Sequence, residues 1–135
     1  MDEQHNPTFG PDIAEQFQWE STLNKEAAAP YIKQRKELCQ SLEQLLGEEG
    51  LLCLPTAPGV ASVKNAKGEA LQTRRLQTLQ MTCIAGLAGL PQLTIPAGEI
   101  DGFLIGLSLI AGVNQDEKLL TWVNQYIPAL HSSSN

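Results

Sequence analysis

Four consecutive apolar residues, Leu51-Leu52-Cys53-Leu54, stand between Gly50 and Pro55, and this short run constrains the fold more than any other feature. A continuous apolar run of this length, bounded by turn residues, is typical of a strand that is buried on both faces. Such a strand needs helices to cover its sheet. The run therefore predicts an α/β protein.

Helical patterns lie on both sides of this run. Apolar residues recur at spacings of three and four before Gly47, which predicts an amphipathic helix with Pro30 in its first turn, or with a kink if the helix starts at Lys25. Gly10-Pro11-Asp12 predicts the start of an earlier, short helix. A third helix is expected over residues 74–87. The residues expected on the buried sides of the two longer helices are Tyr31, Arg35, Leu38, Cys39, Leu42, Leu45 and Leu46, and then Leu76, Leu79, Cys83 and Leu87.

The remaining elements follow Pro91. Residues 93–95 and 103–110 are predicted to form two antiparallel strands, with Asp101-Gly102 as a hairpin-turn signal. Asn114 and Glu117 are spaced as a capping pair for a last helix. The prediction is one domain over residues 1–130, with about three strands and about four helices, and a polar tail over 131–135. The last helix is expected to bury Leu119, Leu120, Val123, Tyr126 and Ile127 and to end at Pro128.

Charge and cysteine usage exclude several classes of function. The 135 residues carry 9 basic and 15 acidic side chains, a net charge of −6, so neither nucleic acid nor an anionic membrane is an expected partner. No segment reaches the roughly 20 apolar residues of a membrane span. The start of the chain is polar and acidic, unlike a signal peptide. Cys39, Cys53 and Cys83 are interpreted as buried reduced thiols, which favours a cytoplasmic protein.

No catalytic constellation is visible in the sequence. A nucleophilic hydrolase needs a serine or cysteine beside a base, but His5 and His131 both lie near the ends of the chain. Clustered metal ligands and a phosphate-binding glycine loop are also missing from the sequence. We therefore expect no catalytic residue, no metal and no cofactor in this chain.

Four stretches, in this order, resemble the C-terminal third of amidase-signature enzymes. Nearly the whole chain, about residues 8–127, takes part in the resemblance. That family hydrolyses amide bonds with a serine nucleophile, a second serine and a lysine base, all supplied by an earlier Gly- and Ser-rich segment that nothing here matches. The resemblance implies the C-terminal portion of the family's mixed-sheet fold. The stretches are FGPDIAE at 9–15, LLCLPTAP at 51–58, CIAGLAGLPQLTIP at 83–96 and DGFLIGLSLI at 101–110.

The resemblance also implies a substrate-binding wall. The loop at Thr56 to Pro58 and the face of a helix at Leu79 to Cys83 would approach the acyl pocket of such an enzyme. The expected substrate contacts are therefore Thr56, Pro58, Leu79 and Cys83. Leu79 is apolar where glutamine-using relatives are expected to have a polar group, which indicates a less polar amide.

Three functional hypotheses remain. The first is a C-terminal amidase segment, truncated or split, that is inactive alone and acts on a small amide only together with an N-terminal amidase portion. The second is a standalone interaction module or a degenerate remnant. The third, an amidase that is active alone, lacks candidate residues. Since excision would leave strand edges unpaired, self-association is also expected.

Overall fold

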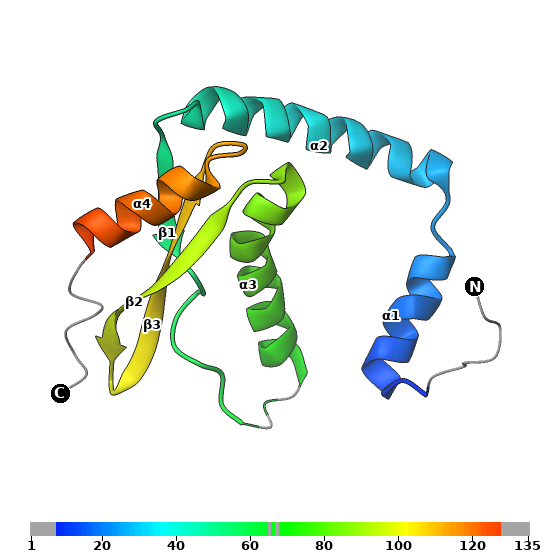
Figure 1. Cartoon of the computed structure of the whole chain (residues 1–135). Helices are drawn as coiled ribbons and strands as arrows, with labels where there is room; N and C mark the ends of the chain where they lie inside the picture. The colour runs from blue at the N-terminus through cyan, green and yellow to red at the C-terminus, as the bar shows by residue number, and fades with distance from the viewer. Residues whose placement is uncertain (1–7, 65, 67, 128–135) are drawn as a thin grey trace. The chain divides into compact units, whose positions relative to one another are not determined.

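The computed structural model describes residues 8–64, 66 and 68–127. Contacts divide the chain into two units, one ending at Gln34 and one starting at Arg35, and each is described by itself. The predicted class is confirmed, since the described residues form four helices and three strands (Figure 1). Their bounds are α1 Pro11–Ser21, α2 Lys25–Leu46, β1 Leu51–Pro55, α3 Gly68–Ala88, β2 Gln92–Ile100, β3 Phe103–Ala111 and α4 Asp116–Tyr126.

The first unit contains α1 and the beginning of α2. Helix α1 starts at Pro11 as predicted, and the rings of Phe9 and Phe17 lie 4.9 Å apart between centroids. Helix α2 starts at Lys25, the earlier of its two expected starts, so Pro30 lies inside it. The side chain of Asn24 accepts a hydrogen bond from the backbone N–H of Ala27 at 2.8 Å, which caps this start.

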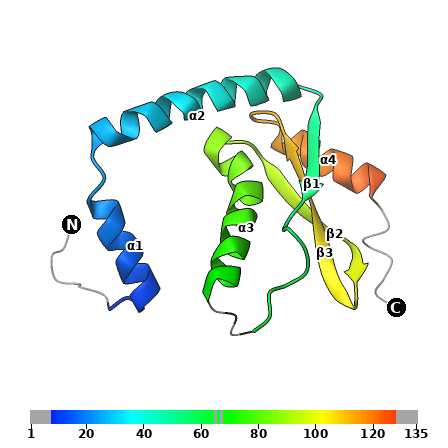
Figure 2. The ribbon, with the colours of Figure 1, turned by 180° about the vertical axis from the view of Figure 1, so that it is seen from behind.

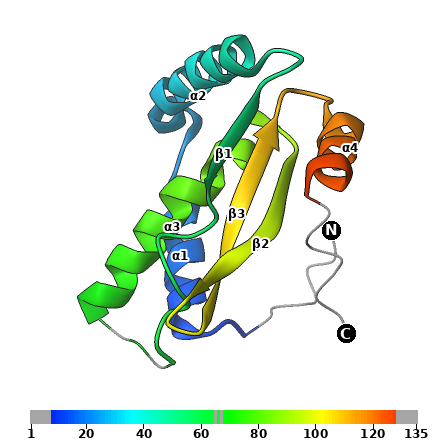
Figure 3. The same cartoon turned by 90° about the vertical axis from the view of Figure 1, so that its left-hand side faces the viewer.

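The second unit is built around a three-stranded sheet in the order β1-β3-β2 (Figure 3). Both pairings are antiparallel, with Leu52 opposite Ile110 and Thr94 opposite Ser108. Strand β2 is longer than predicted, because a bulge between Pro96 and Gly98 lets the pairing continue. β1 and β2 form the two edges of this sheet, and self-association through them stays a prediction.

Alternate residues of the central strand face two separate cores. Ile110 is 0% exposed and packs against Leu46 of α2 and Ala85 of α3. Leu109 lies on the opposite face and packs with Ile95 and with Leu119 of α4. The sheet is therefore sandwiched, with α3 and the end of α2 on one face and α4 on the other (Figure 2).

Strand β1 and the cysteines correct two expectations. β1 is not buried on both faces, because as an edge strand it leaves Cys53 exposed. Cys39 and Cys83 are only half-buried, so the prediction of three buried thiols is wrong. All three are free.

The helices bury different faces from those predicted. Helix α3 begins at Gly68, and Leu76 and Leu79 are 60% and 59% exposed rather than buried. The reason is that small and polar side chains of α3 allow a closer approach to the sheet than leucine would. Tyr31, Leu38, Leu45, Leu87, Leu120 and Tyr126 are likewise exposed against expectation. The side of α3 that faces the sheet carries Leu71, Arg74, Thr78, Met81, Ala85 and Ala88.

The predicted capping pair of the last helix is wrong. The N-cap of α4 is Gln115, and no side chain caps it. Asn114 instead adopts a φ of 60°, the left-handed conformation that asparagine tolerates. It thereby forms the tight turn in which the N–H of Gln115 donates to the Gly112 carbonyl at 3.2 Å.

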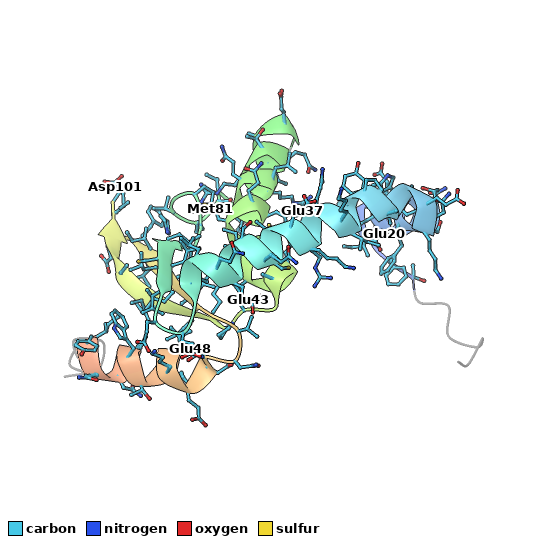
Figure 4. All side chains as sticks on the ribbon, turned by 90° about the horizontal axis from the view of Figure 1, so that it is seen from above. Glu20, Glu37, Glu43, Glu48, Met81 and Asp101 are labelled. Carbon is cyan, nitrogen blue, oxygen red and sulfur yellow. The ribbon has the colours of Figure 1, made fainter. Side chains whose placement is uncertain are left out.

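The connections α2–β1 and β3–α4 meet at one end of the sheet. Lys118 of α4 donates to the Glu48 carbonyl at 2.6 Å and pairs with the Glu49 carboxylate at 2.5 Å. Figure 4 shows Glu48 beside α4. Gly112 and Gly47 approach so closely here that a Cβ on Gly112 would lie 2.2 Å from the Gly47 carbonyl oxygen. The crossing therefore requires glycine at position 112.

None of the helices among the described residues has the length and apolarity that crossing a membrane requires. The predicted tail at 131–135, the helix end at Pro128, and both histidines, His5 and His131, lie outside the described residues.

Candidate functional site

A pocket of about 880 Å³ lies at the end of β1. Its walls are the loop that follows β1, one side of α3, and the hairpin of β2 and β3. Figure 4 marks Met81 on α3 and Asp101 at the turn of that hairpin. Most of the lining is apolar. The lining residues are Pro55, Thr56, Ala57, Pro58, Gly59, Val60, Ala61, Ser62, Arg74, Thr78, Met81, Thr94, Ile95, Pro96, Ile100, Leu104, Ile105 and Gly106.

The first residue of the loop is fixed to the sheet. The N–H of Thr56 donates to the Gly106 carbonyl at 2.9 Å. A Cβ on Gly106 would lie 2.9 Å from the Thr56 hydroxyl oxygen and 3.1 Å from Cγ2 of Thr94. The glycine therefore leaves room for two threonine side chains to lie across the central strand.

A buried hydroxyl network holds those threonines in place. Ser108 is 0% exposed, and its Oγ lies 2.9 Å from the hydroxyl of Thr56 and 3.2 Å from that of Thr94. Nε2 of Gln92 also donates to Ser108 Oγ at 2.9 Å. Because a buried polar group without a partner is costly, this network fixes the rotamers of the pocket wall.

Arg74 connects the middle of the loop to α3. Its Nη2 donates to the carbonyl of Val60. Gly59 adopts a φ of +149°, and a Cβ there would lie 3.3 Å from Nη1 of Arg74. Glycine at this position therefore allows both the loop conformation and the close approach of the guanidinium.

The far end of α3 is held by α2. Nε of Arg35 donates to the Leu87 carbonyl at 2.7 Å, and the Cys39 thiol lies 3.6 Å from the same oxygen. This carbonyl belongs to the last turn of α3, where intrahelical donors are missing. The contacts thereby fix the helix that forms one wall of the pocket.

The structure brings together two of the four predicted substrate contacts. Thr56 and Pro58 both line the pocket. Leu79 lies instead beside a shallower depression of about 310 Å³, next to Arg75 and Thr82. The Cys83 thiol faces the Gln80 carbonyl at 3.8 Å and lines neither hollow. Substrate contact by all four residues stays a prediction.

Sequence reasoning missed the polar residues of the pocket wall. Arg74, Thr78 and Met81 share the sheet-facing side of α3, but the leucines on its other side suggested the wrong face. Thr94 and Ser108 stand among apolar strand residues, and only the register between β2 and β3 shows that they meet. That register depends on the length of the hairpin, which the bulge changes.

In the part of the chain that the structure describes, no serine or cysteine lies beside a base. Hydrogen bonds from these side chains go to backbone carbonyls or to uncharged groups, as with Ser21, Ser41 and Ser108. No cluster of three or more metal-ligating side chains is found in residues 8–64, 66 and 68–127. These residues can shape a pocket, but they do not form a nucleophile–base pair.

Ser108→Ala is expected to lower the free energy of unfolding by about 1–3 kcal/mol, because three buried hydroxyl and amide groups lose their shared partner. Urea denaturation followed by circular dichroism measures this change. The control is Ser62→Ala, also in the pocket wall but with no side-chain hydrogen bond among the described residues, which should change stability by less than about 0.5 kcal/mol. Equal effects of the two substitutions would contradict a stabilising network.

Comparison with known proteins identifies relatives of this chain. A family model described as Amidase matches residues 2–120. Amidase 1 of Arabidopsis thaliana is 33% identical over 118 residues, which cover 87% of this chain and 28% of that relative. Amidase 1 of Oryza sativa subsp. japonica is 29% identical over 125 residues, covering 92% and 29%. One subunit of the glutamyl-tRNA(Gln) amidotransferase of Azotobacter vinelandii is 37% identical over 79 residues, covering 58% and 16%.

Solved structures share the fold. A crystal structure of an amidase superposes with a TM-score of 0.73 at 21% identity, covering 90% of this chain and 29% of that one. The corresponding amidotransferase subunit of Thermotoga maritima gives a TM-score of 0.57 at 24% identity, covering 84% and 26%. The chain thus spans less than a third of the length of these relatives. By its match to the family model, its relatives and its fold, the chain belongs to the amidase family and corresponds to a C-terminal part of such enzymes.

Proposed function

We propose that this chain forms one wall of the substrate pocket of a serine-type amide hydrolase and does not hydrolyse amides alone. The nucleophile, the base and the oxyanion hole would come from an N-terminal amidase portion. The observation that carries the proposal is the pocket itself, which is built on the matched family fold and has no nucleophile–base pair among its described lining residues.

The pocket wall has the rigidity that substrate positioning requires. Thr56 is held by Ser108 and by the Gly106 carbonyl, and Arg74 fixes the loop at Val60. Pre-organised side chains of this kind position a substrate without the entropic cost of ordering a loop. The apolar lining favours a small amide with an apolar acyl group, in agreement with the apolar Leu79.

Exposed leucines support an N-terminal amidase portion as the partner. Leu76 and Leu79 of α3 lie in water in this chain, together with Leu87 at the end of the same helix. Neighbouring apolar side chains that are left exposed are typical of a surface that another protein segment covers. The free cysteines are compatible with a cytoplasmic location, which is part of this proposal.

The same exposed surface supports a second candidate, a standalone interaction module. Under this alternative, the partner need not carry a serine signature, and no hydrolysis follows from its binding. The hairpin tip, with Ile100, Phe103 and Leu104 exposed, adds to the apolar area available for such binding. Restored amide hydrolysis distinguishes the first function from the second.

A graft tests the proposed function. The matched region of Arabidopsis Amidase 1 is replaced by residues 2–120 of this chain, and hydrolysis of an aryl amide that the intact relative turns over is measured. We expect the graft to regain activity, whereas the relative with this region deleted should have none. A graft that folds, as judged by its thermal transition, but remains inactive would favour the interaction module.

A further inference from the structure

The described part of the pocket contains a single ionisable group. Among its described lining residues only Arg74 carries a charge, and the others are apolar, glycine, serine or threonine. The Arg74 side chain is half-buried. A cation placed in mostly apolar surroundings is stabilised strongly by an anionic partner, because water solvates it less well there than at an open surface.

Arg74 has no carboxylate partner among the described residues. Its one side-chain hydrogen bond there goes to the Val60 carbonyl, through Nη2. A guanidinium carries a planar fork of N–H donors, so this bond leaves other donors available. The Thr78 hydroxyl donates at 2.9 Å to the backbone carbonyl of Arg74 and therefore does not neutralise the guanidinium.

The anchoring of Arg74 favours recognition over a purely structural role for its charge. The bond to Val60 needs a donor but no positive charge, since the acceptor is a neutral carbonyl. That bond also restricts the side chain to the edge of the cavity, beside the loop that begins at Thr56. A fixed guanidinium fork binds a carboxylate with two parallel hydrogen bonds, at a smaller entropic cost than a free side chain.

We propose that Arg74 is a binding residue for a carboxylate, so that the pocket takes ligands with an apolar body and one carboxylate group. This inference deepens the proposed function and rests on it for the identity of the reaction. The carboxylate can belong to the amide substrate itself or to the acid that hydrolysis releases. Both share the chemistry that the guanidinium recognises.

Direct binding to the full chain tests the inference without any hydrolysis. The probes are 4-phenylbutyrate and its neutral counterpart, 4-phenylbutanamide, and affinities come from the shifts of backbone amide NMR signals of pocket residues. We expect the carboxylate to bind about tenfold more tightly than the amide. Arg74→Met should remove this difference by weakening only the carboxylate. Arg75→Met is the matched control on the same helix, outside this pocket, and should preserve the difference.

Two outcomes would overturn the inference. Equal affinities for the two probes in the wild-type chain, including no binding of either, exclude carboxylate recognition. Loss of both probes in Arg74→Met shows that Arg74 only clamps the loop. Neither outcome depends on the activity of the graft, so failure of this inference and failure of the proposed function are separable.

The active graft distinguishes the two sources of the carboxylate. A substrate carboxylate predicts a lower KM for an amide with a distal carboxylate than for its uncharged counterpart, and Arg74→Met should abolish the gap. A product carboxylate predicts equal KM values and competitive inhibition by the released acid, which Arg74→Met should weaken. The absence of both effects in an active graft would contradict the assignment of Arg74.

Discussion

Gly112→Val is expected to lower the free energy of unfolding by about 3 kcal/mol, at the upper end of the cost of overpacking. A Cβ at this position would lie 2.2 Å from the Gly47 carbonyl oxygen, a backbone atom that cannot move without shifting the α2–β1 connection. The same crossing carries the bonds from Lys118 to Glu48 and Glu49. Urea denaturation followed by circular dichroism measures the loss.

Gly86→Ala is the matched control for this prediction. Gly86 lies within α3, and nothing in the described structure is within 4 Å of a Cβ added to it. Alanine has a higher helix propensity than glycine, so this substitution should raise stability by about 0.5–1 kcal/mol. A Gly112→Val variant as stable as the wild type would show that the two connections do not approach each other as described.

Ile110→Ala is expected to lower the free energy of unfolding by about 2–5 kcal/mol, with Ile110→Val costing about 0.5–1.5 kcal/mol. The side chain is 0% exposed and lies at the centre of the core that joins β3 to α2 and α3. Its truncation leaves a cavity between Leu46 and Ala85, which these elements can close only in part. Thermal unfolding of the three proteins checks both the direction and the order.

Leu104→Ala serves as the control on the same strand. Leu104 is 72% exposed, so its truncation should change the stability of this chain by less than about 0.5 kcal/mol. Equal losses for Ile110→Ala and Leu104→Ala would show that the core is not packed on the central strand.

The sequence predicted the order of the elements well, because each has a local signal. Pro11 at the start of α1, Gly47 after α2 and Asp101-Gly102 in the hairpin act within a few residues, and the structure has a boundary at each. The buried faces were predicted less well. The leucines of α3 at positions 76 and 79 gave the stronger hydrophobic signal, yet its smaller side chains face the sheet. A surface that awaits a partner has the same apolar pattern as a core-facing one.

The candidate site was partly predictable for a related reason. The loop at Thr56 and Pro58 directly follows an obvious strand, so its place at the end of the sheet could be predicted. The meeting of Thr56 with Ser108 depends on two strand registers, and the bulge after Pro96 is not visible as a sequence pattern. Arg74 could not be distinguished from Arg75 by sequence alone.

The most direct test of the account compares initial rates of aryl amide hydrolysis in three samples. These are this chain alone, the part of Arabidopsis Amidase 1 outside the region that this chain matches, and an equimolar mixture of the two. The account predicts hydrolysis by the mixture and none by either piece alone. Hydrolysis by this chain alone that persists through repurification would contradict it.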